Sequence, residues 1–529
     1  MAHAYDAIVI GSGFGGAVAA CRLAENGMRV LVLERGRRWT PKTYPRTPAD
    51  AWIFDNDAPE RRNGWIDLRL WKNMAVVQGA GIGGGSLIYA NVSVQAHPEL
   101  FEHGWPPEIT FDTLKPYYDR VGRMLNVQTL PERQATRRYN LVRDAAEAIG
   151  KGARFRAVPL AVTFSDDWSY DLAEPHDQRH SRAWINAQGQ EQGTCIHCGN
   201  CDIGCPVKAK NTLDLNYIPW AERHGAEFRP LHVVTHIKPV AEGYQIGFDR
   251  IDRGARIRGA VTAPRLILAA GSLGSTELLL RARDQHKTLP AISWRLGKGW
   301  SCNGDFLTPT AYPGRDVSPT RGPTISAAID FLDGSEGGQR FFIEDGGIPD
   351  LLGNLLAGHS QSWRSRRRNR ALHRVLGHLV NNRDPLSCLM PWFAQGIDAA
   401  DGQLRLARSW WRPFSGRRLT LDWNPAHTEP VMNAIVAMHV KLARASGGTP
   451  AVPVTWSWLK NLITPHPLGG CNMGTSPANG VVGHTGEVFG YPGLYVADGA
   501  IVPEALGLNP SRTIAALAER ISDHIVLRG

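Results

Sequence analysis

The stretch Asp6-Ala-Ile-Val-Ile-Gly-Ser-Gly-Phe-Gly-Gly16 decides the fold of this 529-residue chain. Residues 6–10 are apolar and rich in β-branched side chains, which predicts a short buried parallel strand. A glycine-rich turn follows directly, and residues 17–25 then predict a helix. A second apolar run over residues 29–33 predicts another strand, which ends at Glu34. This order of strand, glycine turn, helix and strand is typical of a doubly wound α/β domain.

The residues of this turn suit a dinucleotide. Gly11 permits a tight turn, Gly13 lets backbone approach a pyrophosphate, and Gly16 lets the helix pack closely on the strand. The amide groups at the helix N-terminus attract negative charge. Glu34 lies about 20 residues past the loop, where an acidic side chain hydrogen-bonds a ribose hydroxyl. The alternative is a glycine-rich turn before a helix, with no ligand.

Two further segments favour a flavin over a nicotinamide. Residues 76–86, Val-Val-Gln-Gly-Ala-Gly-Ile-Gly-Gly-Gly-Ser, form a second glycine-dense loop that can bring backbone against a flat ring or a diphosphate. Residues 493–499, Gly-Leu-Tyr-Val-Ala-Asp-Gly, predict a strand ending in Asp498, which can contact the ribityl or phosphate part of a flavin. A mobile surface loop and an ordinary turn residue are the respective alternatives. A last helix is expected over 513–525.

Three more blocks carry a resemblance to a known family. They are Gly271-Ser-Leu-Gly-Ser-Thr-Glu-Leu-Leu279, His466-Pro-Leu-Gly-Gly-Cys471 and Gly507-Leu-Asn-Pro510. With these blocks in this order, the chain resembles the glucose–methanol–choline (GMC) flavoenzymes, and most of all the bacterial cholesterol oxidases. The blocks are spread over nearly the whole chain. The similarity is weak over about 102–192 and 313–410, where substrate domains of the family diverge.

The resemblance implies FAD as cofactor and an α/β fold with two domains. The expected fold is a Rossmann-like FAD-binding domain with an inserted α+β substrate domain built on an antiparallel sheet. The FAD-binding domain would comprise 1–95, 193–300 and 460–529, and the substrate domain 96–192 and 301–459. Within the latter, 418–423 predicts a strand and 429–445 an amphipathic helix. The residues expected to contact FAD are Gly11, Gly13, Phe14, Gly15, Gly16, Glu34, Gly79, Gly83, Gly84, Ser86, Asn91, Val234, Gly271, Asp498, Gly499, Asn509, Pro510 and Thr513.

The resemblance also assigns catalytic residues. His466 would position the substrate hydroxyl and assist loss of its proton, since imidazole suits both tasks near neutral pH. Asn509 would lie on the other side and orient substrate and reduced flavin as a neutral amide. Glu344 matches the place where cholesterol oxidases carry the glutamate that moves a proton during double-bond isomerisation. The match is short, Asp345 beside it leaves the assignment ambiguous, and a surface carboxylate at a strand end is the alternative.

Four cysteines depart from the best-known cholesterol oxidases. The run Cys195-x2-Cys198-x2-Cys201-x3-Cys205-Pro206 has the spacing with which bacterial ferredoxins hold iron–sulfur clusters. Three of the four also resemble those that hold a three-iron cluster in bacterial FAD glucose dehydrogenases of the same family. Zinc fits less well, because no long spacer separates two ligand pairs. Empty thiols remain open, as do disulfides, which a reducing compartment disfavours. An iron–sulfur cluster would favour a dehydrogenase over an oxidase.

Composition narrows the class of partners. A hydrophobic content of 43% and a charged content of 20% indicate a folded protein. The net charge of +10 suits anionic partners such as phosphates, membrane surfaces or acidic redox proteins, or is simply a solvated basic surface. No nucleic-acid-binding motif is present, so nucleic acid is not expected. No signal-like or membrane-spanning run is evident, which predicts a soluble cytoplasmic protein.

One basic segment suggests a membrane surface. Residues 363–380 combine several arginines with apolar side chains at near-helical spacing. Such a helix can lie peripherally on an anionic membrane, or can pack on the substrate domain with its arginines solvated.

The leading hypothesis is oxidation of a hydrophobic alcohol, sterol-like or cyclic and secondary, to a ketone by hydride transfer to flavin. The electron acceptor would be oxygen, a quinone or a cytochrome. One alternative is a dehydrogenase for a sugar or another alcohol that passes electrons through an iron–sulfur cluster. An alternative of another class is a redox carrier or sensor without alcohol turnover, which would have no use for His466 and Asn509.

Overall fold

The computed structural model describes residues 4–349, 386–408, 416–453, 456 and 460–528. The glycine turn starts a five-stranded sheet in the order β11-β2-β1-β15-β25, in which every neighbouring pair is parallel. This confirms the expected Rossmann-like architecture. The strands come from segments far apart in the sequence: β1 (Ala7–Ile10), β2 (Val30–Leu33), β11 (Glu227–Arg229), β15 (Arg265–Leu268) and β25 (Leu494–Val496).

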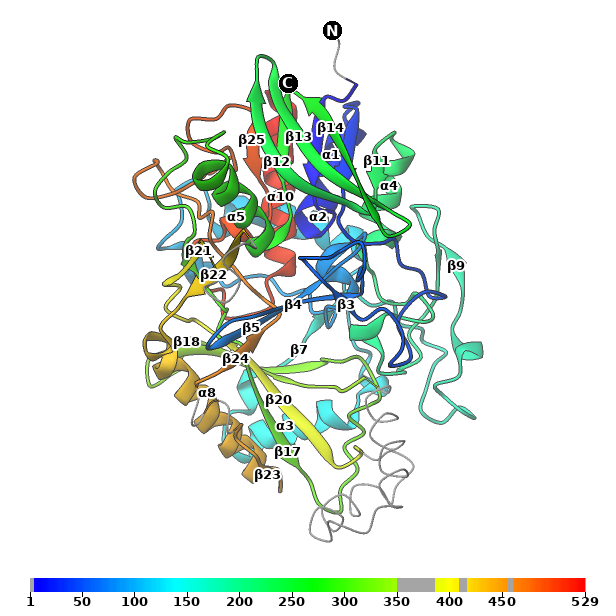
Figure 1. The fold of residues 1–529 in the computed structure, drawn as a ribbon. Helices are drawn as coiled ribbons and strands as arrows, with labels where there is room; N and C mark the ends of the chain where they lie inside the picture. Colours follow the sequence, from blue (N-terminus) through cyan, green and yellow to red (C-terminus); the bar gives the residue numbers. More distant parts are fainter. Residues whose placement is uncertain (1–3, 350–385, 409–415, 454–455, 457–459, 529) are drawn as a thin grey trace, which may run out of the picture.

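Helices and a small antiparallel sheet cover the parallel sheet. Helix α1 (Phe14–Glu25) contacts both α4 (Tyr217–Arg223) and α10 (Ser511–Leu527), and α10 also contacts α2 (Phe111–Met124). The antiparallel sheet lies in front of α1 and α10 in Figure 1 and contacts the parallel strands. Its strands are β12 (His232–Val240), β13 (Gly243–Asp252) and β14 (Ala255–Ala263).

A six-stranded antiparallel sheet forms the lower half of the molecule in Figure 1. Its order is β23-β17-β20-β19-β18-β7, and the helices α3 (Arg137–Ala148) and α8 (Pro425–Ala445) contact it. Helix α8 begins four residues earlier than expected, because the Asn424 side chain caps it and Pro425 suits its first turn. The strands are β7 (Phe155–Ala157), β17 (Phe306–Ala311), β18 (Ala327–Glu336), β19 (Gln339–Asp345), β20 (Leu389–Gly396) and β23 (Thr449–Pro450).

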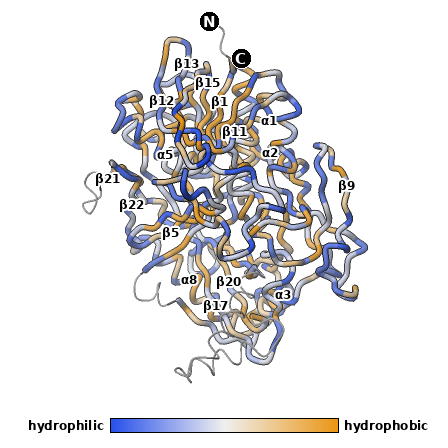
Figure 2. Tube along the Cα trace, turned by 45° about the vertical axis from the view of Figure 1, so that its right-hand side comes forward, coloured by the Kyte–Doolittle hydropathy of each residue, from blue (hydrophilic) through white to orange (hydrophobic). Residues whose placement is uncertain are grey.

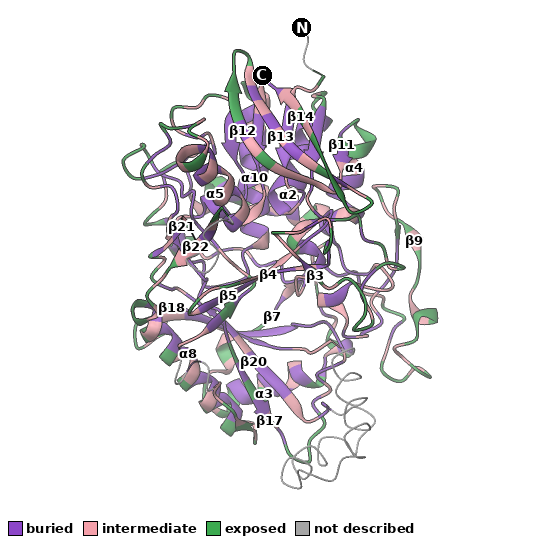
Figure 3. Cartoon of the chain, viewed as in Figure 1, coloured by how far each residue is buried: buried purple, intermediate pink, exposed green. Residues whose placement is uncertain are grey.

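Smaller sheets join the two halves. A four-stranded sheet lies between them in Figure 1 and consists of β3 (Ile53–Phe54), β4 (Ile66–Leu70), β5 (Met74–Gly79) and β24 (Leu462–Thr464). A three-stranded sheet of β16 (Lys298–Trp300), β21 (Gly402–Arg408) and β22 (Arg417–Asp422) packs beside α5 (Gly271–Leu280). The strand expected over 418–423 is β22. The hairpin of β9 (Trp184–Ile185) and β10 (Glu191–Gln192) lies at the edge of the molecule (Figure 3).

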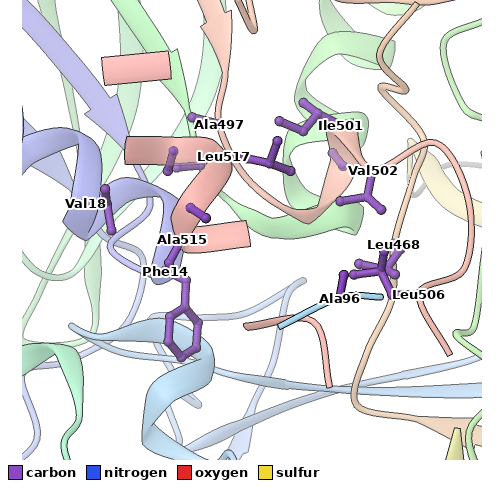
Figure 4. Close-up of a cluster of buried hydrophobic side chains, with 14 of the residues drawn as sticks. Phe14, Val18, Ala96, Leu468, Ala497, Ile501, Val502, Leu506, Ala515 and Leu517 are labelled. Atoms are coloured by element: carbon purple, nitrogen blue, oxygen red, sulfur yellow. The ribbon is translucent and has the colours of Figure 1, made fainter. Parts of the chain in front are cut away.

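The buried core lies directly behind the loops that form the candidate active site. Figure 2 shows apolar residues gathered along the strands around β1 and β15. Figure 4 shows Phe14 and Val18 of α1 in one cluster with Ala515 and Leu517 of α10. The same cluster holds Leu468, two residues after His466, and Leu506, three residues before Asn509. No helix in the described part of the chain is long and apolar enough to span a membrane.

Candidate active site

A cavity of about 570 Å³ lies along the carboxyl ends of the parallel strands. Its wall includes residues that directly follow β1, β2 and β15, namely Gly11, Glu34 and Ala269. Ligands of open parallel sheets bind at this edge, and the volume is typical of a small-molecule site. His466 and Asn509 also line this cavity. The structure therefore brings the predicted nucleotide loop and the predicted catalytic pair to one site.

The glycines make a close backbone cradle. Gly11 has φ +93°, and a Cβ on Gly15 would lie 1.7 Å from the carbonyl oxygen of Ala497. A Cβ on Gly84 would lie 2.6 Å from Cα of Gly13, so the two glycine loops touch each other. Helix α1 begins at Phe14 without a side-chain cap, which leaves its first amide groups for an anion. This cradle fits the diphosphate of a dinucleotide.

Glu34 lies at the end of the cavity where the nucleotide part of the cofactor is expected. Its carboxylate accepts hydrogen bonds from the backbone and hydroxyl of Ser12, at 3.1 and 2.7 Å, and from the backbone of Gly36 at 2.9 Å. Glu34 is 5% exposed and lines the cavity. These donors fix the carboxylate at the end of β2, where a ribose would lie.

Most of the expected FAD contacts line the cavity, and five do not. The lining residues are Gly11, Gly13, Phe14, Gly15, Glu34, Gly79, Gly84, Val234, Gly271, Asp498, Gly499, Asn509 and Pro510. The other five, Gly16, Gly83, Ser86, Asn91 and Thr513, do not line it, so the structure does not place them at the cavity surface. A Cβ on Gly16 would meet the Gly11 carbonyl at 2.0 Å, and Thr513 hydrogen-bonds Tyr118 at 2.9 Å.

Asp498 ties two loops of the wall together. Its carboxylate accepts hydrogen bonds from the backbone of Gly271 at 2.8 Å, from Ser275 Oγ at 2.5 Å and from the backbone of Ala500 at 2.8 Å. Burial raises the pKa of Asp498 to about 6, and these donors oppose the rise. Asp498 thus joins the turn after β15 to the turn after β25 at the cavity.

His466 follows β24 in a loop of the C-terminal segment. Its ring atom Nδ1 lies 2.8 Å from Oδ1 of Asp305, and its backbone N–H donates to Thr464 Oγ1 at 2.9 Å. The imidazole side chain is 16% exposed, whereas that of Asp305 is fully buried. Asn509 is 5% exposed, and its Oδ1 has no hydrogen-bond partner among the described residues. The amide oxygen is therefore available to a bound group.

Glu344 lies within β19 and is fully buried, so the alternative of a surface carboxylate is wrong. Its Oε2 accepts a hydrogen bond from Gln395 Nε2 at 2.9 Å, across the β19–β20 pair. Burial raises the pKa of Glu344 to about 8, and the amides of Gln395 and Asn509 oppose the rise. Glu344 is therefore a neutral acid at pH 7. Asp345, the competing candidate, instead accepts a hydrogen bond from Arg138 at 2.7 Å.

Asp305 and Gln395 are residues of the site that no sequence pattern indicated. Asp305 is separated from His466 by 161 residues, and Gln395 from Glu344 by 51. Neither belongs to a short motif, so no local spacing in one sequence points to them. Pairing of β19 with β20 brings Gln395 to Glu344, and the backbone bridge between Ser301 and Leu468 brings the Asp305 segment to the His466 loop.

The four cysteines lie around a second, small cavity of about 20 Å³. None of them forms a disulfide in the structure. No three His, Cys, Asp or Glu side chains in the described residues gather as ligands of one metal ion. Buried Lys210 also lines this cavity, and it donates hydrogen bonds to the carbonyls of Leu87, Tyr89 and Cys201. Tyr89 lines the large cavity, so Lys210 connects the two sites.

The basic segment 363–380 lies outside the described residues, so its proposed membrane contact stays a prediction.

Comparison with known proteins identifies the family. Residues 9–57 match the model of an NAD(P)-binding Rossmann-like domain, and residues 400–518 match the model of GMC oxidoreductases. A cholesterol oxidase of Acinetobacter baumannii is 30% identical, over 98% of this chain and 94% of its own length. A cholesterol oxidase of Mycobacterium tuberculosis is also 30% identical, over 98% and 90%.

A solved structure shows the same fold. Pyridoxine 4-oxidase from Mesorbium loti superposes with a TM-score of 0.63 at 16% identity, over 98% of both chains. The chain therefore belongs to the GMC oxidoreductase family and is an FAD-dependent alcohol oxidoreductase.

Proposed function

We propose that the chain oxidises a hydrophobic alcohol, sterol-like or cyclic and secondary, to a ketone. The observation that carries the proposal is the convergence of His466 and Asn509 on the cavity that also holds the glycine cradle. The two relatives that are 30% identical are named cholesterol oxidases, which supports a bulky apolar substrate for this chain. Phe393 lies 6.4 Å from His466, ring centre to ring centre, and adds apolar surface at this end.

The roles of the chain's own residues follow from their contacts. Bound FAD supplies the hydride acceptor. His466 holds the hydroxyl and takes its proton at the ring atom that does not face Asp305. Asn509 offers an amide to the oxygen of the substrate from the other side.

Glu344 is proposed as the residue that moves a proton between carbon atoms of an unsaturated ketone product. It is buried, and its Oε1 has no hydrogen-bond partner among the described residues. As a base it must first ionise, so isomerisation would rise with pH toward about 8. Glu344→Gln would abolish isomerisation of an added β,γ-unsaturated ketone and spare flavin reduction by saturated alcohols.

The test of the reaction is anaerobic bleaching of the bound flavin. The purified holoenzyme is mixed with a 3β-hydroxysterol, cyclohexanol, a long-chain primary alcohol and glucose in separate reactions. Bleaching by the sterol or by cyclohexanol supports the proposal. Bleaching by glucose alone would favour the sugar dehydrogenase. A flavin that stays oxidised with every alcohol would favour the redox carrier or sensor.

The four cysteines support a second proposal, a multi-iron cluster as an electron outlet to a quinone or cytochrome. All four line one cavity, and thiolates are the usual ligands of such clusters. One tetrahedral ion would need sulfur atoms about 3.8 Å apart at zinc–sulfur bonds of about 2.3 Å. No such ligand set occurs in the described part of the chain. The present cavity has room for about one water, so the thiols would have to move apart.

An absorption spectrum of anaerobically purified protein tests the cluster. Iron and sulfide are assayed on the same sample, and the variants Cys198→Ser and Cys201→Ser are compared with Cys388→Ser, which lies outside the motif. Loss of iron and sulfide in Cys198→Ser and Cys201→Ser, but not in Cys388→Ser, would support the cluster and a dehydrogenase. Flavin absorption without iron in the wild type would leave oxygen as the proposed acceptor.

A further inference from the structure

Asp305, which does not line the cavity, faces the ring atom Nδ1 of His466, which does. Oδ1 of Asp305 lies 2.8 Å from Nδ1 of His466, and the hydroxyl of Thr464 donates to Oδ2. Thr464 also accepts the backbone N–H of His466, so three side chains form one closed set of hydrogen bonds. A carboxylate accepts hydrogen bonds only, which requires the proton of a neutral imidazole to lie on Nδ1.

Among the described residues, Asp305 has no cationic partner other than His466. Its side chain is fully buried, and the other titratable groups that face it are the Glu344 carboxyl and the Cys302 thiol. Burial raises the pKa of Asp305, and its contacts with His466 and Thr464 oppose the rise. An uncompensated carboxylate in this position would be costly, so His466 and Asp305 depend on each other.

The segment that carries Asp305 is itself fixed to both catalytic loops. Ser301 exchanges two backbone hydrogen bonds with Leu468, at 3.0 and 3.1 Å, just after His466. Asn303 accepts the backbone N–H groups of Leu506 and Gly507 at 2.9 and 3.0 Å. It also donates to the carbonyl of Leu508 at 2.9 Å, just before Asn509. Residues 301–305 therefore hold the two loops at a fixed separation.

We propose that Asp305 is the positioning residue for His466. It keeps the proton on Nδ1, aims Nε2 at the substrate hydroxyl, and stabilises the imidazolium that forms when Nε2 accepts the hydroxyl proton. Bound FAD would supply the acceptor for the hydride of the carbinol C–H bond, while the O–H proton would go to His466 and the C=O double bond would form. The inference rests on the proposed role of His466 and extends it to a residue that touches neither substrate nor cofactor.

The kinetic test compares Asp305→Asn with Asp398→Asn. Asp398 is a matched control, because it is a buried carboxylate that binds Ser301 and Cys302 of the same segment without touching His466. Flavin reduction in the holoenzyme is followed by stopped flow at several concentrations of the alcohol that reduces it fastest. This separates the rate constant of flavin reduction from the apparent Kd of the alcohol. Asp305→Asn should reduce the rate roughly 100-fold, with the apparent substrate Kd changed less than about threefold. Equal rates in the two variants would overturn the proposal.

A spectroscopic test needs neither turnover nor a substrate. In holoenzyme labelled with ¹⁵N-histidine, His466 is assigned by its loss in His466→Gln, and its ¹⁵N shifts report which ring atom carries the proton. The wild type should carry it on Nδ1, and Asp305→Ala should move it to Nε2. A wild-type proton on Nε2 would overturn the proposal even if the variants fail to fold. If no alcohol reduces the flavin, the proposed function fails while this measurement still decides the role of Asp305.

Discussion

Glu344 and Asp345 are neighbours in β19, yet their carboxyl groups lie on opposite faces of the strand. Glu344 binds the neutral amide of Gln395 at 2.9 Å, whereas Asp345 pairs with Arg138 at 2.7 Å. Both residues are fully buried. Alternation along a strand sends adjacent side chains to opposite faces, so Glu344 lies on the face of Gln395 and Asn509, whereas Asp345 lies on the other face in a structural ion pair.

Glu344→Gln should make the stability of the protein less dependent on pH. The native pKa of Glu344 is raised to about 8 by burial, whereas an unfolded glutamate titrates near about 4.3. Between these values the native state holds a proton that the unfolded state has lost, so stability falls as pH rises from about 4.3 to about 8. The loss is on the order of 3–5 kcal/mol. Thermal unfolding of wild type and variant from pH 5 to 9 measures it.

The difference between the unfolding temperatures of wild type and Glu344→Gln, followed against pH, isolates the contribution of Glu344. Other buried acids with raised pKa values, such as Asp498 at about 6 and Glu504 at about 7, titrate alike in both proteins. The unfolding temperature of the wild type should fall toward that of the variant, or below it, as the pH rises. Parallel curves would show that Glu344 does not carry the proton.

Removing one partner of the Arg138–Asp345 pair should destabilise the fold strongly. Arg138 is fully buried and donates to the carbonyls of Arg321, Pro323 and Thr324 as well as to Asp345. Arg138→Met leaves the Asp345 carboxylate buried without its cation, which costs about 3–5 kcal/mol. Urea unfolding of the holoenzyme measures the loss. Arg137→Met, beside it but exposed, should change stability by less than about 1 kcal/mol.

His466→Gln should slow flavin reduction without loss of FAD. The glutamine keeps a polar side chain in the cavity but cannot accept a proton at neutral pH. A general base typically contributes 100-fold or more, so the reduction rate should fall by at least about 100-fold. The ratio of flavin to protein absorbance should stay at the wild-type value. Reduction at the wild-type rate would remove His466 from the proposed chemistry.

The sequence allowed the nucleotide half to be predicted because its signals are local. The strand, the glycine turn and Glu34 lie within 30 residues, and each has its own physical role. The catalytic loops could be predicted only through the family resemblance. Asp305 and Gln395 could not, because partners so far apart in the chain meet only through strand pairing and loop bridging. The spacing of the cysteines predicted their gathering around one cavity, but no spacing fixes the distances between their sulfur atoms.

Two glycine substitutions should separate folding from cofactor binding. A Cβ on Gly15 would lie 1.7 Å from the Ala497 carbonyl, inside the core that joins α1 to β25. Gly85 also lines the cavity, but a Cβ there meets nothing within 4 Å in the chain itself. Gly15→Ala must push backbone apart and should lower both stability and FAD content. Gly85→Ala adds a methyl group only to the space that FAD would fill.

The two substitutions are therefore expected to differ: Gly15→Ala lowers stability and FAD content, whereas Gly85→Ala lowers only FAD affinity. Gly85→Ala should retain the unfolding midpoint of wild-type apoprotein within about 0.5 kcal/mol, because a surface change away from packing contacts costs little. Its affinity for FAD should fall at least about tenfold, measured by quenching of FAD fluorescence on titration with apoprotein. If Gly85→Ala binds FAD as tightly as the wild type, the second glycine loop does not contact the cofactor. Gly27→Ala, at a surface turn with φ +83°, serves as the opposite control, since it should lower stability and leave FAD affinity unchanged.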